Sequence, residues 1–463
     1  MGMNKTVLWM VWLVVTFALG GYLGYRLLGE DKSVFLPGST SHGHYQIEMA
    51  CTACHSESFG GGEVLQEACM ECHGAELKTA NDSHPRSKFT DPRNADRLAK
   101  LDARVCVTCH VEHQPEITTA MAVTVPADVC MHCHLDIAKD RPSHEGMGFQ
   151  TCASAGCHNF HDNRGLYEDF LLKHLHEADV LPQPRVAERN LQASLELLDS
   201  YPLDKYPVRQ LALEERDAPL GYQQDAKINH QWHETAHAQA GVNCSACHAS
   251  DSAGKVNWIE KPDHTVCMSC HQDEGEGFLT GRHGMRLAQQ LPPMTPGQAR
   301  QPMHNQAHNK ALTCISCHGS HEFNTQHAAV EACLGCHDDS HSQAYKASPH
   351  YSLWRAEQND AEKSATGVSC ATCHMPRTLE RHGDKTRVLI QHNQNDNLRP
   401  NEKMLRDVCM QCHGLSFSID ALADSELVQG NFSGKPNSHI QSLDMAERRS
   451  LKKRPRPAGE DSG

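Results

Sequence analysis

One long apolar run stands near the start of the chain. Residues 7–25 carry no charged side chain, and Lys5 and Arg26 lie on either side of them. A helix needs about 20 apolar residues to cross the hydrocarbon core of a bilayer. The pattern therefore predicts a transmembrane helix within residues 1–30. No small-residue cleavage site of the A-x-A kind follows it, which favours an uncleaved signal anchor over a cleaved signal peptide.

Apolar positions are sparse and irregular over the rest of the chain. The leucines at 191, 195, 197 and 198 predict a short amphipathic helix, which Tyr201-Pro202 and Tyr206-Pro207 then end. No run of alternating β-branched residues predicts a sizeable sheet. We therefore expect a mainly α fold with much irregular structure.

Composition adds that a conventional core would be hard to build. Of the 463 residues, 39% are hydrophobic and 5% aromatic, and the mean hydropathy is −0.57. Such a chain is poor in material for a packed interior. The formal net charge of −14 argues against nucleic-acid binding, which needs a basic face.

The cysteines follow a single rule. All 22 belong to pairs whose second member is immediately followed by histidine. Ten pairs read C-x-x-C-H, namely Cys51/Cys54, Cys69/Cys72, Cys106/Cys109, Cys130/Cys133, Cys244/Cys247, Cys267/Cys270, Cys314/Cys317, Cys333/Cys336, Cys370/Cys373 and Cys409/Cys412. The eleventh, Cys152/Cys157, has four residues between its cysteines. C-x-x-C-H is the attachment signature of c-type haem.

The chemistry explains the residue types. Two thiols on one turn of chain can add across the two vinyl groups of a porphyrin, and the next histidine can then ligate the iron. These predicted proximal ligands are His55, His73, His110, His134, His158, His248, His271, His318, His337, His374 and His413. We therefore expect about eleven covalent haems. Their apolar faces would supply the interior that the composition lacks.

Two other readings fit less well. Disulfides also use an even cysteine count, but they do not need a trailing histidine. Zinc sites would need a second Cys or His pair at a matching distance. A local disulfide remains open for Cys152/Cys157.

The second axial ligand of each iron must come from another histidine if the haems are bis-histidine. Candidates three residues beyond a proximal histidine are His113, His161 and His321. Those six to eight residues before a motif are His44, His144, His237 and His308. Isolated candidates are His84, His283, His350 and His392, with His174 and His439 as further members of that group. A surface role stays open for each of these. Bis-histidine ligation gives low potentials.

The motifs fall into two groups. Five lie before residue 160 and six lie between 244 and 413. We therefore expect a signal anchor at 1–30, a pentahaem module at 31–164, a haem-free connector at 165–229, a hexahaem module at 230–443 and a disordered tail at 444–463. One continuous haem array with a decorated loop is the alternative. The basic run at 448–456 is a solvated tail or a docking arm for acidic partners or anionic lipid.

Two family resemblances follow from these motifs. Residues 42–161, with the stretch Cys106–His113 and the longer eleventh motif, resemble class III-type multihaem cytochromes. Residues 230–443 resemble the octahaem superfamily of hydroxylamine oxidoreductase, pentahaem nitrite reductase and tetrathionate reductase. The supporting segments are 230–244, 341–350 and 367–377. The second resemblance implies either electron transfer or chemistry at one open haem.

Departures from the enzymes favour electron transfer. No motif ends in Lys, as the catalytic motif of nitrite reductases does, and no Tyr follows Tyr351 to form the cross-link of hydroxylamine oxidoreductases. A Lys-ligated haem of the tetrathionate-reductase kind stays open. An open haem would be sought first at His271, with residues 281–284 lining its pocket, but a bis-histidine haem there is the favoured alternative.

The sequence thus predicts a membrane-anchored cytochrome of the bacterial cytoplasmic membrane with its bulk in the periplasm, where c-type haem is attached. It would carry electrons between the quinone pool or a membrane complex and periplasmic redox proteins with basic docking patches. The alternative is a multihaem reductase or oxidase of nitrite, hydroxylamine or tetrathionate. We assign no catalytic residue.

Overall fold

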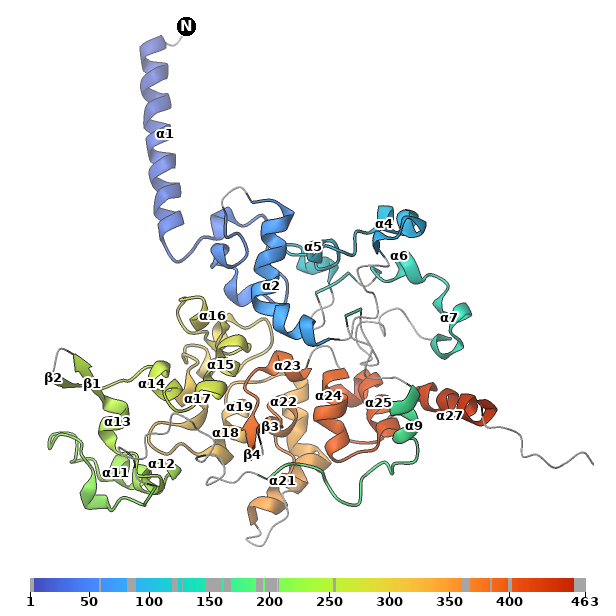
Figure 1. Cartoon of the computed structure of the whole chain (residues 1–463). Coiled ribbons are helices and arrows are strands. Elements are labelled where there is room, and N and C mark those ends of the chain that lie inside the picture. The colour runs from blue at the N-terminus through green and yellow to red at the C-terminus, as the bar shows by residue number, and fades with distance from the viewer. Residues whose placement is uncertain are drawn as a thin grey trace, which may run out of the picture. The chain divides into compact units, whose positions relative to one another are not determined.

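The computed structural model describes residues 4–57, 60–80, 89–118, 124–126, 128–145, 160–161, 168–188, 195, 206, 208–252, 255–359, 367–383, 385–398 and 402–453. Helices and turns dominate these residues (Figure 1). The chain divides into two compact units. Unit 1 comprises Met1–Thr79, Arg86–Cys133 and Gln289–Pro292, and unit 2 comprises Ala80–Pro85, His134–Ala288 and Pro293–Gly463.

Unit 1 begins with its longest helix, α1 (Lys5–Leu28), where Asn4 Oδ1 accepts a hydrogen bond from Thr6 N and caps the start. Its other α-helices are α2 (Gly62–Thr79), α4 (Ala95–Lys100), α5 (Cys106–Cys109) and α6 (Met131–His134), which crosses the boundary by one residue. Its 3-10 turns are η1 (Ser33–Phe35), η2 (Tyr45–Ile47), η3 (Cys51–Ala53), η4 (Pro92–Asn94) and η5 (Pro115–Ile117).

Unit 2 is made of many short helices. The α-helices are α7 (Ile137–Asp140), α9 (Glu168–Lys173), α11 (Ala226–His233), α12 (Ala236–Gln239), α13 (Cys244–His248), α14 (His264–Met268), α15 (Gln272–Thr280), α16 (Met285–Ala288), α17 (Cys314–His318), α18 (Thr325–Ala329), α19 (Glu331–Leu334), α20 (Ser340–Ala344), α21 (Pro349–Asn359), α22 (Cys370–His374), α23 (Gln394–Leu398), α24 (Glu402–Asp407), α25 (Leu415–Ala423), α26 (Ser425–Gln429) and α27 (Ser442–Lys453). The 3-10 turns are η6 (Pro142–His144), η8 (Leu213–Glu215), η9 (Pro296–Gln298), η10 (Asn305–Ala307), η11 (Tyr345–Ala347) and η12 (Cys409–Gln411).

Strands are few in the part of the chain that is described. They form two antiparallel hairpins, β1 (Ala249–Ser252) with β2 (Lys255–Trp258) and β3 (Arg377–His382) with β4 (Lys385–Ile390). Ala249 pairs with Trp258, and Arg377 with Ile390. The expected fold class, mainly α with much irregular structure, is confirmed.

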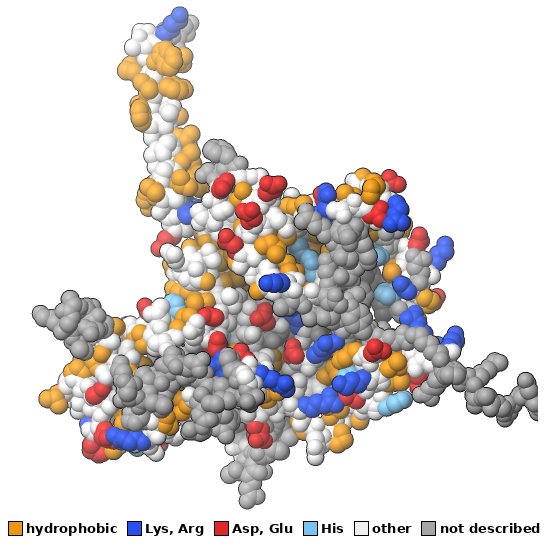
Figure 2. Space-filling view, viewed as in Figure 1, with side chains coloured by type: hydrophobic (Ala, Val, Ile, Leu, Met, Phe, Trp, Pro, Cys, Tyr) orange, Lys and Arg blue, Asp and Glu red, His pale blue; other side chains and the backbone are white. Residues whose placement is uncertain are grey.

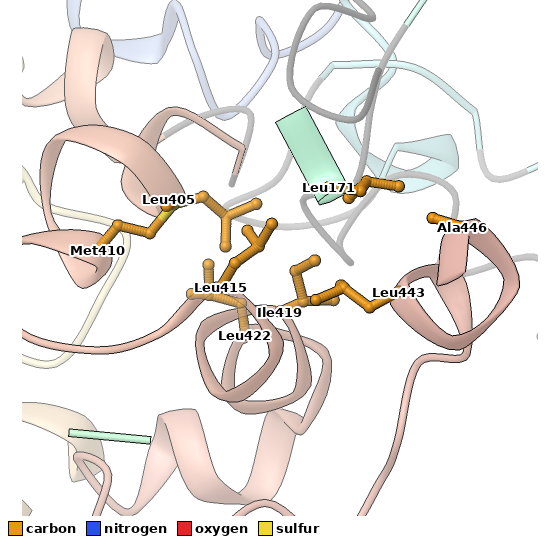
Figure 3. Packing of buried hydrophobic residues seen from close by; sticks show 8 residues of the cluster. All are labelled: Leu171, Leu405, Met410, Leu415, Ile419, Leu422, Leu443 and Ala446. Carbon is orange, nitrogen blue, oxygen red and sulfur yellow. The ribbon is translucent and has the colours of Figure 1, made fainter. Parts of the chain in front are cut away.

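The largest apolar cluster of the described residues lies in unit 2 (Figure 3). It joins α9, α24, α25 and α27, and its members are Leu171, Leu405, Met410, Leu415, Ile419, Leu422, Leu443 and Ala446. Met410 lies between the two cysteines of the last motif, so this cluster holds that motif in place.

The structure describes parts of two of the expected segments, the tail and the connector. Residues 444–453 are helical in α27, whose Leu443 and Ala446 are buried against the cluster around Leu171. The tail is therefore ordered there, because Leu443, Ala446 and their neighbours form an apolar face that the basic composition conceals. Residues 454–463 lie outside the description. Residues 165–229 belong to unit 2, and the helix expected around Leu191–Leu198 lies almost wholly outside the described residues.

Candidate functional site

Three of the C-x-x-C-H motifs form single helical turns. In α13, α17 and α22 the helix starts at the first cysteine and ends at the histidine. Asn243 and Ser369, each just before a first cysteine, accept hydrogen bonds from backbone N–H groups and cap two of these turns. Residues three apart share one face of a helix. Both thiols of such a motif therefore point to the same side.

Seven of the predicted proximal histidines face a second histidine that is not part of any motif. The pairs, with the distance between ring centroids, are His44 and His73 (6.0 Å), His237 and His271 (6.1 Å), His248 and His321 (5.8 Å), His283 and His337 (6.3 Å), His318 and His392 (6.3 Å), His341 and His374 (6.1 Å), and His350 and His413 (6.2 Å). All six proximal histidines of residues 244–413 are included.

This spacing fits one metal ion between each pair. A bond from an imidazole nitrogen to a transition metal is about 2.0–2.1 Å long, so two such bonds plus the ring radii give roughly 6 Å between ring centres. Direct contact between the rings would bring them closer. The residues present therefore fit bis-histidine iron centres, beside cysteines placed for covalent attachment.

The lowered pKa values of four histidines also favour metal ligation. Burial, with a smaller effect of neighbouring charged histidines, lowers the pKa of His237, His283, His350 and His374 to about 4. A neutral imidazole keeps the lone pair that a metal needs. These four rings are therefore available as ligands at neutral pH.

Backbone carbonyls fix the orientation of other rings. Among the described residues of unit 2, Nδ1 donates to a carbonyl oxygen in four cases, which are His248 to Ile259 (2.7 Å), His341 to Val428 (2.6 Å), His392 to Ile390 (2.8 Å) and His413 to Asp179 (2.8 Å). A carbonyl can only accept, so the proton is on Nδ1 and Nε2 is left to bind a metal.

A continuous cavity of 1730 Å³ runs through unit 2. The cysteines and histidines of the motifs at 244–248, 267–271, 314–318 and 409–413 line it. A pocket for one small ligand has about 300–1,000 Å³. The cavity is therefore large enough for several flat groups along the motifs.

Glycines bring one of the ligand segments into place. A Cβ at Gly277 would lie 3.3 Å from the backbone nitrogens of His392 and Asn393, and one at Gly281 would lie 2.8 Å from the carbonyl oxygen of His392. The segment after β4 thus packs directly on α15 and the turn behind it. That turn also carries His283, so the positions of two predicted second ligands depend on this close approach.

Unit 1 has a different arrangement around His44. Glu112 Oε1 lies 2.6 Å from Nδ1 of His44, and Ser41 donates to Glu112 through both its backbone N (2.8 Å) and its Oγ (2.8 Å). Burial raises the pKa of Glu112, but the hydrogen bonds from His44 and Ser41 outweigh it, so the net shift is downward. His113 Nδ1 donates to Gly38 O at 2.9 Å.

His113 and His321 share an unusual backbone. Both have positive φ, 61° and 65°, which is uncommon for residues other than glycine. Each is the second histidine of an H-x-x-H stretch. His321 faces His248 of an earlier motif, not the neighbouring His318. The ligand role of His113 stays a prediction.

The predicted second ligands therefore divide into three sets. His44, His237, His283, His321, His350 and His392 each face a proximal histidine. His144 ends η6 and His161 contacts Phe160 (ring centroids 5.1 Å), and their ligand roles stay predictions. The ligand roles of the proximal histidines His55, His110 and His134 stay predictions as well. His84, Cys152, Cys157 and His158 lie outside the described residues.

His308 closes η10, and its ligand role stays a prediction. One histidine outside the predicted ligands also faces a proximal histidine. His341 takes the position opposite His374. It lies four residues after His337, one more than the spacing that singled out His113 and His321. Likewise His271 faces His237, so the pocket sought there contains a second imidazole.

Helix α1 has the features of a membrane span. It has 24 residues and a hydropathy of 1.9, and none of its residues is buried. Apolar side chains cover its visible face (Figure 2). A signal sequence near the N-terminus has the same length and composition, so these features fit an anchor and a signal sequence equally.

Comparison with known proteins agrees with the motifs. A family model described as cytochrome c3 matches residues 43–135. The multiheme cytochrome MtrA of Shewanella baltica (strain OS185) is 24% identical over 191 residues, which are 38% of this chain and 43% of that protein. The chain thus matches less than half the length of this curated relative. The resemblance of residues 230–443 to the octahaem superfamily is not among these findings and stays a prediction.

The attachment motifs, the paired histidines and these similarities converge on one class of protein. They support a multihaem c-type cytochrome with a role in electron transfer.

Proposed function

We propose that the chain is a membrane-anchored periplasmic electron carrier with about eleven covalently bound haems. The observation that carries this proposal is the histidine facing every proximal histidine of residues 244–413. Bound haem supplies reversible one-electron oxidation and reduction of iron. If both histidines of a pair bind the iron, the site would exchange electrons without offering a place for a substrate.

The cysteines order the attachment sites along the chain. The first cysteines of two consecutive motifs are in hydrogen-bond contact through their thiols in three places. These are Cys69 with Cys106, Cys267 with Cys314, and Cys333 with Cys370. The second cysteine of a motif lies close enough to the next motif for their thiols to interact electrostatically in five places. These are Cys54 with Cys72, Cys109 with Cys133, Cys247 with Cys267 and Cys270, Cys317 with Cys333 and Cys336, and Cys373 with Cys409 and Cys412.

Two kinds of junction therefore alternate. Within unit 1 they connect the first four motifs in sequence order, and within unit 2 they connect the last six. Neighbouring attachment sites are thus also neighbours in sequence, which supports a linear wire over a branched cluster. The fifth motif, Cys152/Cys157, lies outside the described residues.

The anchor and the partners complete the proposal. Helix α1 would hold the protein at the bacterial cytoplasmic membrane, where the quinone pool or a membrane complex supplies electrons. Periplasmic redox proteins would then accept them, and the net charge of −14 favours partners with basic docking surfaces. The alternative, a reductase or oxidase at one open haem, would have to use a motif other than the six in residues 244–413.

A membrane assay tests this function. Membrane vesicles carrying the full chain should reduce its haems when quinol is generated in the bilayer. A form without residues 1–30, exported by a cleavable signal, should keep its full haem content and its reduction by dithionite but lose reduction by quinol. Equal quinol reduction of both forms would contradict the anchor's role. Fast steady-state turnover of nitrite, hydroxylamine or tetrathionate would favour the enzyme.

A further inference from the structure

One axial histidine is held by a side-chain carboxylate at full hydrogen-bond contact. Nδ1 of His44 lies 2.6 Å from Oε1 of Glu112. Hydrogen bonds between charged and neutral partners are shorter and stronger than neutral ones, and this one is short. The four anchored rings of unit 2 meet neutral carbonyl oxygens instead.

The carboxylates near two proximal histidines of unit 2 lie farther from the ring nitrogen than Glu112 lies from that of His44. The gap is 3.8 Å from His271 Nδ1 to Glu274 and 3.6 Å from His337 Nδ1 to Asp339. Separations of this length lie outside normal hydrogen-bond geometry. Among the pairs that the structure describes, the pair of His44 and His73 therefore receives the strongest anionic contact.

The surrounding residues hold Glu112 in a fixed place. Ser41 is fully buried and donates to both carboxylate oxygens. Three residues earlier, the carbonyl of Gly38 accepts from His113 Nδ1. A Cβ atom at Gly38 would clash with the carbonyl oxygen of His113, so the two backbone segments are in close contact. The segment 38–44 is thus attached at both ends to residues 112–113, which makes the contact with His44 preorganised.

We propose that Glu112 is a positioning residue that lowers the reduction potential of the haem held between His44 and His73. This rests on the proposed cytochrome function. A carboxylate that accepts the Nδ1 proton makes the imidazole a more basic ligand. A more electron-rich ligand stabilises ferric iron over ferrous iron, and hydrogen bonding around the axial ligand is one of the protein's means of setting potential.

The haem of the second motif would therefore have a lower reduction potential than the haems of unit 2 whose histidines donate to backbone carbonyls. Electron transfer to this haem from its neighbours would be unfavourable in free energy, and transfer away from it would be favourable. Glu112 lies in the stretch that follows the third motif, so that stretch also tunes the haem of the second.

The test is a redox titration of the full-length protein and its Glu112→Gln variant. Outer-shell partners of metal ligands are worth about 10–100-fold. A tenfold loss of preference for ferric iron moves a one-electron couple by about 59 mV. The reduction potential of one haem should therefore become more positive by about that amount, and the g values of one low-spin haem should change. Glu48→Gln is the matched control, because Glu48 accepts from Thr40 in the same segment.

A double-mutant cycle assigns the effect to the right haem. In a His44→Met background, Glu112→Gln should cause no further shift, because the coupling passes through the His44 ring. Additive shifts would overturn the proposal, and so would titrations of Glu112→Gln and wild type that superimpose. If Glu112→Gln loses haem, Glu112→Asp decides. Its shorter side chain should raise the same potential by less, and an unchanged potential overturns the proposal.

Haem content separates this outcome from the wider one. Intact mass and low-spin signals of the wild type test the cytochrome function itself. If the haems are present and only the potential is unmoved, the role of Glu112 fails and the proposed function stands.

Discussion

The two compact units differ in what fills their interiors. In unit 2 the buried hydrophobic residues form clusters around Leu415, Trp232 and Val330. Among the described residues of unit 1, Ala68 is the one buried hydrophobic residue, while Thr40, Ser41, Gln46 and Thr118 are buried polar ones. Unit 1 nevertheless carries four pairs of attachment cysteines.

We infer from this difference that the haems proposed for unit 1 take the place of an apolar core. Small domains without enough apolar surface need covalent or metal-based support to fold. Unit 1 has hydrogen bonds such as those of Glu112 and Ser41 in place of packed side chains. We therefore expect its folded state to depend on haem attachment more strongly than that of unit 2.

Withholding haem should have the largest effect. In a strain without cytochrome c maturation, α2 of unit 1 should lose all protection from hydrogen exchange. Helix α25 of unit 2 should keep partial protection, because Leu415 and Ile419 pack on protein atoms. Hydrogen exchange followed by mass spectrometry measures both helices together. Equal loss in the two would break the comparison.

A core substitution sharpens the comparison from the other side. Leu415 is fully buried, so Leu415→Ala should lower the free energy of unfolding of unit 2 by about 2–5 kcal/mol. The exposed Leu451 in α27 provides the control, and Leu451→Ala should change it by less than about 0.5 kcal/mol. Denaturant titration of the haem-loaded protein gives both values. A negligible effect of Leu415→Ala would mean that haem dominates unit 2 as well.

The close approach at Gly281 should give a smaller, local effect. In Gly281→Ala the new methyl group would press on the carbonyl of His392, which should cost about 1–3 kcal/mol. It should also alter the low-spin signal of the haem on His318. Gly221→Ala is the control, since a Cβ there has open space. Unchanged spectra for Gly281→Ala would show that His392 is not held by this contact.

A pH dependence at the end of unit 2 should be the smallest effect. Hydrogen bonds to Asp420 and Asp444 raise the pKa of His439 above its ordinary value. The raised pKa means that the stabilising contribution is complete below the ordinary pKa of about 6.5 and is lost as pH rises through the raised value. Protection of α27 should fall over that range in wild type and stay level in His439→Gln. A level profile in both would exclude the contribution.

The sequence reveals the local chemistry of this protein better than its long-range pairs. A proximal histidine is recognisable because the motif places it directly after two cysteines. The partner of His318 is His392, which follows a hairpin 74 residues later, and nothing local to either residue indicates the pairing. The same limit left His341 out of the predicted ligands.

The ordered C-terminal helix illustrates a second limit. Residues 448–453 are strongly basic, which is typical of a solvated tail, but Leu443 and Ala446 earlier in α27 are buried against Leu171. Two apolar side chains at helical spacing are a weak signal in a polar segment. Tertiary packing, which the sequence does not display, decided the outcome.

Spin-quantified electron paramagnetic resonance of the fully oxidised protein tests the central claim most directly. If two histidines hold each iron, the spectrum should consist of low-spin ferric haems, with ten or all eleven haems accounted for. The six motifs in residues 244–413 should contribute no high-spin signal. High-spin iron amounting to two or more haems per chain, shifting on addition of nitrite, hydroxylamine or tetrathionate, would contradict the account of this chain as an electron wire.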